Sequence, residues 1–228
     1  MSDASSMDRA ISRRARVAVA RIRDARVEQG PSLEPPDPGL VASLRHHLLG
    51  GETHYPVRPG MVDLRKRVAG RLTRLGLPPR GVDSVLITAS EGEALFVTIL
   101  GLDLFPDGSL VGMAGGRHQA LLDWMGISIE DESQDTSDGV VRYRVPASGV
   151  SVVVLADALF RKNPPTCEPD EVLVGSFSSL VGMAPFTLGF AAAEPDVVKR
   201  ITKWKQASSI CSPAPSQRAA LWALGVRP

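Results

Sequence analysis

Two adjacent serines, Ser178 and Ser179, lie in the segment GSFSSLVGMAPFTLGF at residues 175–190, in a setting where a reactive side chain could act. A serine attacks a substrate only when a base within hydrogen-bond reach accepts its proton. The sequence has no serine–histidine–acid arrangement and no Gly-x-Ser-x-Gly turn, the motif that presents a nucleophilic serine in many hydrolases. We therefore interpret Ser179 as a polar loop residue and predict no catalytic residue.

Metal-ligating residues do not cluster along the chain. Cys167 and Cys211 are far apart and belong to no Cys-x-x-Cys motif, and of the four histidines only His46 and His47 are adjacent. These spacings predict no metal site. Two isolated cysteines fit a reducing compartment, and no stretch is long and apolar enough to cross a membrane. We expect a cytoplasmic protein without a membrane partner.

Composition and charge indicate a folded domain that does not bind nucleic acid. The hydrophobic fraction of 43% and the charged fraction of 22% are those of a globular protein. The 26 basic and 25 acidic residues nearly cancel, and the basic residues are scattered, so the broad positive field of a nucleic-acid binder is missing. A length of 228 residues suits one sizeable domain.

Helices and strands are expected to alternate along most of the chain. Apolar positions at helical spacing predict an arginine-rich amphipathic helix over residues 9–28. The segment GPSLEPPDPG at 30–39 holds four prolines and predicts an extended arm. Beyond the arm, the predicted helices are 40–49, 61–76, 91–105, 117–126, 195–207 and 215–225, and the predicted strands are 84–88, 108–114, 151–157, 171–177 and 187–193.

This alternation predicts an α/β fold with a mostly parallel sheet that helices cover on both sides. We expect the N-terminal helix and extended arm to occupy residues 1–39 and one α/β domain to occupy residues 40–228. Ser90 directly precedes the helix predicted from residue 91 and is its expected N-cap.

Five segments, in the same order, resemble class I/II aminotransferases, the fold-type I enzymes that use pyridoxal phosphate (PLP). THYPVRPGMVDLRKRVAGRL (53–72) resembles their Tyr, Gly and Leu-Arg stretch, and VLITASEGEAL (85–95) is similar to their first strand and phosphate-binding helix start. DGSLV (107–111) resembles their Gly-Asp turn, and VVVLADALF (152–160) their strand ending in Asp-Glu-x-Tyr. The segment 176–190 is similar to the Ser-x-Ser-Lys stretch that ends in Arg-x-Gly-Tyr, especially in histidinol-phosphate aminotransferases. The resemblance implies the large domain of these enzymes without the C-terminal small domain.

The departures from this family concern the groups that hold the cofactor. Ser179 stands where the family has the lysine that forms the Schiff base, and Thr187 stands where it has the arginine that binds the phosphate. Glu91 places a carboxylate at the helix start, although a helix N-terminus suits an external anion best when no carboxylate fills it. The resemblance therefore implies a shortened chain that lacks the Schiff-base lysine. We expect no cofactor and no PLP-dependent transaminase activity.

Two positions keep the family's residues. Asp157 matches the aspartate that pairs with the pyridine nitrogen, and Tyr55 matches the tyrosine that reaches the phosphate across a dimer interface. Phe160 replaces the tyrosine after Asp157, and MAGGRHQA (113–120) lacks the aromatic residue that stacks on the ring. Asp157 could contact a ligand at the end of its strand or could cap a turn. Lys162 could replace the missing amine, but nothing in the sequence directs it inward.

The residues expected to line the old cofactor cleft also have structural explanations. Glu91 and Glu93 are favourable charges at a helix start, and Tyr55 fits a buried tyrosine with one partner. Arg117 and His118 belong to a glycine-rich loop that is either solvated or able to hold an anion. The candidate pocket residues are Tyr55, Ser90, Glu91, Arg117, His118, Asp157, Ser176, Ser178, Ser179 and Thr187.

Two functions remain open, because likeness of fold does not fix function. The first is an aminotransferase-like protein that has lost transamination and reuses the cleft for a small molecule, such as an amino acid or keto acid, or for a PLP-independent reaction in specialised metabolism. The alternative is a non-catalytic or regulatory partner that forms a homodimer, or a heterodimer with an active homologue. Whether the chain is an enzyme is left open by the sequence.

Overall fold

The computed structural model describes residues 37–74, 76–77, 81–106, 108–114, 116–134, 140–156, 165–180 and 182–225. The predicted N-terminal helix and most of the predicted arm lie outside these residues, as do Asp157 and Lys162. The division of the chain at residue 39 therefore stays a prediction.

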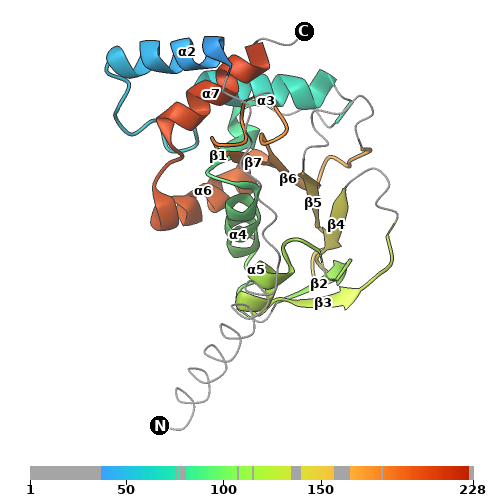
Figure 1. Cartoon of the computed structure of the whole chain (residues 1–228). Coiled ribbons are helices and arrows are strands. Elements are labelled where there is room, and N and C mark those ends of the chain that lie inside the picture. Colours follow the sequence, from blue (N-terminus) through green and yellow to red (C-terminus); the bar gives the residue numbers. More distant parts are fainter. Residues whose placement is uncertain are drawn as a thin grey trace, which may run out of the picture.

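Seven strands of the described residues form one sheet in the order β1-β7-β6-β5-β4-β2-β3 (Figure 1). Five strands run in one direction, and β4 and β7 run in the other. The predicted α/β class is confirmed, and because β4 and β7 are reversed, four of the six neighbouring strand pairs are antiparallel and the sheet is mixed. The strands are β1 (Val85–Thr88), β2 (Ser109–Gly112), β3 (Ser128–Asp131), β4 (Val141–Arg144), β5 (Ser151–Ala156), β6 (Val172–Ser176) and β7 (Gly189–Ala192).

The direction of β4 follows from the length of its connection to β5. Only residues 145–150 join the two strands, and a parallel crossover needs a dozen residues or more. The pair is therefore antiparallel, with Val141 opposite Val154. Neither β3 nor β4 was predicted from the sequence, because the residues of SIED and VRYR are largely polar and no strong apolar run marks them.

Helices cover both faces of the sheet, as the sequence predicted. Successive residues of a strand point to opposite faces, so Val153 packs in one core and Val154 in the other. The first core includes α2 (Pro38–Leu49), α3 (Val62–Arg74) and α7 (Ala214–Gly225), which gather at the top of Figure 1. The second core includes α4 (Glu91–Gly101), α5 (Gln119–Trp124) and α6 (Pro195–Ser209).

The hydroxyl of Thr98, on α4, is buried without a hydrogen-bond partner among the described residues. An unsatisfied buried hydroxyl costs stability that an apolar group of the same shape does not cost. We expect Thr98→Val to raise the free energy of unfolding by about 1 kcal/mol in urea denaturation. Thr202→Val is the control, because the buried Thr202 hydroxyl donates to the carbonyl of Val198 at 2.7 Å. This variant should not gain stability. A loss of stability in Thr98→Val would contradict this expectation.

Strand β1 is an edge of the sheet whose outward backbone groups are covered. Arg65 Nε donates to the carbonyl of Val85 at 2.9 Å, and Ser212 Oγ donates to the carbonyl of Ile87 at 3.0 Å. The amide of Ile87 donates to the carbonyl of Pro59 at 2.9 Å. Edge strands normally present such groups unpaired. Here side chains and a loop satisfy them where an eighth strand would otherwise pair.

An ion pair joins α7 to the segment that follows α2. Arg218 Nε lies 2.5 Å from Glu52 Oε2, and His47 Nδ1 lies 2.9 Å from Glu52 Oε1. The hydrogen bond from Arg218, with a smaller one from His47 and against some desolvation, holds the pKa of Glu52 below its ordinary value. The folded state therefore binds this proton less tightly than the unfolded chain does. This stabilisation is present above the unfolded pKa and is lost as the pH falls through the folded pKa.

We expect Glu52→Gln to melt at a lower temperature than the wild type at neutral pH, with the difference closing as the pH falls below the lowered pKa of Glu52. Thermal unfolding of both proteins from neutral pH to about pH 3 measures this closure. Glu130→Gln, an exposed change on β3, is the control and should shift the melting temperature little at any pH. A Glu52→Gln difference that does not depend on pH would contradict the role of the ion pair.

Candidate functional site

The start of α4 is fixed by hydrogen bonds between the end of β1 and the first helical turn. Ser90 is the N-cap, as predicted, and its Oγ accepts from the amide of Glu93 at 3.0 Å. Glu93 Oε2 in return accepts from the amide of Ala89 at 2.5 Å. Thr88 Oγ1 donates to the carbonyl of Ser90 at 2.8 Å. The arrangement is a variant of the capping box that a Ser-x-x-Glu pattern such as 90–93 encodes, because the Glu93 carboxylate accepts from the amide of the residue before the N-cap.

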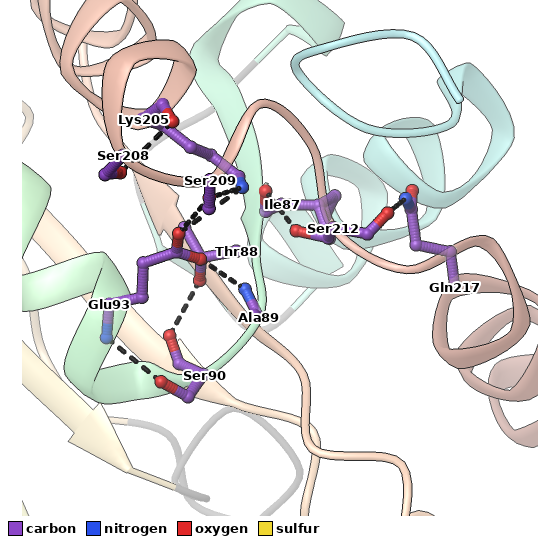
Figure 2. A network of polar contacts seen from close by, with 10 residues as sticks. All are labelled: Ile87, Thr88, Ala89, Ser90, Glu93, Lys205, Ser208, Ser209, Ser212 and Gln217. Atoms are coloured by element: carbon purple, nitrogen blue, oxygen red, sulfur yellow. Dashed lines mark hydrogen bonds and ion pairs between the residues drawn. The ribbon is translucent and has the colours of Figure 1, made fainter. Parts of the chain in front are cut away.

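Glu93 is also held from α6, as Figure 2 shows. Lys205 Nζ lies 3.5 Å from Glu93 Oε1 and donates to Ser209 Oγ at 2.9 Å, and Ser209 Oγ donates to the same carboxylate oxygen. The Lys205 side chain is 0% exposed and the Glu93 side chain 14%. A buried ammonium needs a paired charge, so this pair ties the C-terminal end of α6 to the start of α4.

Lys205 was not among the residues predicted from the sequence to have a role. The buried residues of α6 include Val198, Ile201, Thr202 and Lys205, which follow the spacing of one helical face. That spacing could have placed the lysine on the buried side, but lysine is rarely buried without a partner. Its partner, Glu93, lies more than a hundred residues away and no local pattern points to it.

Strand β7 passes directly against the start of α4. A Cβ on Gly189 would lie within 3.0 Å of backbone atoms of Ser90 and Glu91, a separation that real Cβ atoms do not show. Only glycine therefore fits where β7 begins. Thr187, two residues earlier, is exposed.

The carboxylate of Glu91, the first residue of α4, is the centre of a polar group. Glu91 is 7% exposed, and its Oε1 accepts from His118 Nε2 at 2.8 Å. Arg117 Nε lies 3.5 Å from the same oxygen. The other carboxylate oxygen, Oε2, is buried and has no hydrogen-bond partner among the described residues. The fold thus brings together three of the predicted pocket residues, two of them from the loop that joins β2 to α5.

Tyr143 on β4 lies beside this loop and was missed by the sequence analysis. A Cβ on Gly116 would lie 3.5 Å from the Tyr143 hydroxyl. Burial raises the pKa of Tyr143, and the positive charge of Arg117 partly opposes this shift. The phenol is therefore protonated at neutral pH and able to donate a hydrogen bond.

The remaining predicted pocket residues lie elsewhere or make local contacts. Ser176 Oγ donates to Ser178 Oγ at 2.8 Å and accepts from the Ser178 amide at 3.1 Å, which forms a turn at the end of β6. Ser179 is exposed in that turn. Tyr55 is 82% exposed, so its interpretation as a buried tyrosine is wrong. The loop that carries it lies on the surface, and no packing partner covers the ring within the described chain.

Within the described ranges, no cluster of three His, Cys, Asp or Glu side chains is arranged to hold a metal ion. Across the same residues, no helix combines the length and apolar character that a membrane span requires.

No family model and no curated protein matches the amino-acid sequence, whereas solved structures match the fold. An aminotransferase from Mycobacterium tuberculosis matches with a TM-score of 0.67 and 19% identity over 92% of this chain and 71% of that chain. The aspartate aminotransferase from Thermotoga maritima matches with a TM-score of 0.67 and 17% identity over 100% and 72%. The chain has the fold of the aminotransferase large domain.

The match shows the aminotransferase fold and does not show the reaction, because the identities lie below 20%. A further match is a Methanococcus jannaschii protein whose active site is similar to those of kynurenine aminotransferases, with a TM-score of 0.62 and 17% identity. The alignment covers 86% of this chain but only 62% of that one. This chain therefore spans less than two thirds of that relative's length.

The matched structures correct the prediction about the cofactor. All of those named above are aminotransferases or have an active site of that kind, and aminotransferases of fold-type I use PLP. The aminotransferase fold therefore points to PLP as the cofactor, and the prediction that no cofactor is expected is wrong. Replacement of the lysine and arginine positions by Ser179 and Thr187 does not by itself show that binding is lost.

The residues at the start of α4 nevertheless do not fit a phosphate group. The Ser90 hydroxyl already accepts the Glu93 amide. The buried Glu91 carboxylate leaves Oε2 as an unpaired acceptor, and phosphate oxygens are acceptors with the same sign of charge. What fits a buried carboxylate oxygen is a hydrogen-bond donor.

Proposed function

We propose that the chain is an aminotransferase-like protein that does not carry out PLP-dependent transamination and binds a small molecule at the carboxyl end of its sheet. The main support for this proposal is Ser179, which stands where the resembling enzymes have the Schiff-base lysine. A serine hydroxyl cannot form the covalent link to an aldehyde that an amine forms. The turn around it, in which Ser176 and Ser178 bond each other, supplies no amine either.

The polar group of Glu91, Arg117 and His118 supports ligand binding at this end of the fold. Open α/β sheets bind ligands outside the carboxyl ends of their strands, and these side chains follow β1 and β2 there. A histidine oriented by a carboxylate is able to move a proton, which makes a PLP-independent reaction available. We propose an amino acid or keto acid as the ligand, specialised metabolism as the context and the cytoplasm as the location.

The test is reductive trapping. The purified chain is incubated with PLP and reduced with borohydride, and the product is examined by intact-mass and peptide mass spectrometry. We expect no stoichiometric adduct on one lysine and no transfer of an amino group from amino acids to keto acids, and an active aminotransferase is treated in parallel as the positive control. A stoichiometric adduct on a single lysine would overturn the proposal.

A second candidate function is a non-catalytic partner that forms a homodimer, or a heterodimer with an active homologue. Apolar side chains are exposed on α2 and on the segment after it, and a contiguous exposed apolar surface favours association. Size-exclusion chromatography with light scattering is expected to show a dimer, and a monomer at all concentrations would remove this candidate. The exposed side chains are Val41, Leu48, Leu49, Tyr55 and Val57, and Val62 at the start of α3 is exposed as well.

A further inference from the structure

We infer that Glu91 recognises a protonated nitrogen of the ligand, such as a primary ammonium group, through a charge-assisted hydrogen bond and without a covalent link. The inference rests on the proposed function, because it requires a small molecule at the start of α4. It adds the chemical class of the ligand and the residue that selects it.

The unpaired oxygen of Glu91 is the first observation behind this inference. Buried polar atoms nearly always have a hydrogen-bond partner, and an exception calls for a missing one. Glu91 is 7% exposed, and its Oε1 has two partners while Oε2 has none within the described chain. An ionised carboxylate oxygen only accepts hydrogen bonds. The missing partner is therefore a donor.

Charge decides which donor fits best. A helix N-terminus attracts anions, but at α4 the Glu91 carboxylate already supplies the negative charge that the helix dipole favours. A second anion at this point would meet that charge at close range. A cationic donor forms a charge-assisted bond, which is stronger than a bond from a neutral hydroxyl. An ammonium group therefore fits better than a phosphate, a carboxylate or an alcohol.

The two basic neighbours have different parts in this site. His118 is 14% exposed and lies 2.8 Å from Glu91 Oε1, so it holds the carboxylate in place. Arg117 is 61% exposed, and its Nε is 3.5 Å from the same oxygen, which is a weak contact. Arg117 is thus a loosely held positive charge beside the carboxylate, and it would repel an ammonium group that bonds to Oε2. Removing Arg117 should strengthen ammonium binding, whereas removing the Glu91 charge should weaken it at least tenfold.

The experiment is an NMR titration of the full chain with three probes at matched ionic strength: propylamine, propionate and inorganic phosphate. The side-chain carboxyl carbon of Glu91 and the imidazole nitrogens of His118 are followed. We expect propylamine to shift both signals and to saturate, and we expect the two anions to leave the Glu91 signal unchanged. The carboxyl signal of Glu130, an exposed residue on the edge strand β3, is the control for non-specific pairing of propylamine with surface carboxylates. The shift of that signal should not saturate.

Two variants make the test decisive. Glu91→Gln keeps the shape of the side chain and should weaken propylamine binding at least tenfold, while Glu130→Gln should leave it unchanged. If Glu91→Gln does not fold, Arg117→Ala still tests the inference, because Arg117 is exposed and its removal should not prevent folding. Arg117→Ala should bind propylamine more tightly than the wild type. No response of Glu91 to propylamine in either the wild type or Arg117→Ala would overturn the inference, as would saturable phosphate binding at Glu91.

This failure can be told apart from failure of the proposed function. The trapping experiment reports on a covalent adduct with a lysine, and the titration reports on the Glu91 carboxylate. Absence of both an adduct and an ammonium site would leave the proposed function standing with a different ligand. A stoichiometric adduct would overturn the proposed function whatever Glu91 binds.

Discussion

We expect Glu93→Gln to lower the free energy of unfolding by about 3–5 kcal/mol, the usual cost of removing one partner of a buried ion pair. The substitution keeps the shape of the side chain but leaves the ammonium of Lys205, which is 0% exposed, without a countercharge. It also weakens the capping box, because Glu93 Oε2 accepts the amide of Ala89. Urea denaturation followed by circular dichroism measures the loss.

The design of the control separates charge pairing from ordinary packing. Glu93→Gln combined with Lys205→Met removes both charges and should recover much of the loss, because the cost lies mainly in the unpaired charge. Lys203→Met changes an exposed lysine on the same helix and should stay within about 0.5 kcal/mol of the wild type. If Glu93→Gln costs no more than Lys203→Met, then Glu93 does not compensate a buried charge.

Gly189→Ala should lower the free energy of unfolding by about 3 kcal/mol or prevent folding, at the upper end of what overpacking costs. The added methyl group would lie within 3.0 Å of backbone atoms of Ser90 and Glu91. Backbone atoms cannot rotate away as the end of a flexible side chain can, so β7 or the start of α4 must shift.

Gly81→Ala is the matched control for this substitution. A Cβ on Gly81 has no atom within 4 Å, and its φ of −79° suits any residue. That variant should be as stable as the wild type or slightly more stable, because alanine restricts the unfolded chain. In Gly189→Ala protein that still folds, the NMR signal of the Glu91 carboxyl should move, because the backbone that carries it has shifted. Wild-type stability in Gly189→Ala would show that β7 and α4 can separate freely.

Local patterns in the sequence predicted most of the fold. Apolar runs marked five strands, such as VLIT at 85–88 and VLVGS at 172–176, because strands buried on both faces are apolar throughout. They missed β3 and β4, which have no continuous apolar run and pair with β2 and β5 along the sheet. The N-cap Ser90 was predictable because a capping box lies within four residues.

The candidate site was less predictable, because its contacts join distant residues. Glu91 and His118 were both named as pocket residues, but their hydrogen bond spans 27 positions and follows only from how β2 and α5 pack. Tyr55 was expected to be buried on the general behaviour of tyrosine and is exposed. The prediction of no cofactor failed for another reason: it treated replaced side chains as proof of lost binding, while the matched structures point to PLP.

The covered edge of β1 limits how copies of this chain can assemble. With Arg65, Ser212 and Pro59 bonded to that edge, the carbonyls of Val85 and Ile87 and the amide of Ile87 are not free to pair with an extended segment of another molecule. The opposite edge, β3, carries Glu130 and Asp131, and such charges discourage strand addition. Continuous intermolecular sheets, and the fibres that grow from them, are therefore disfavoured at both ends of the sheet.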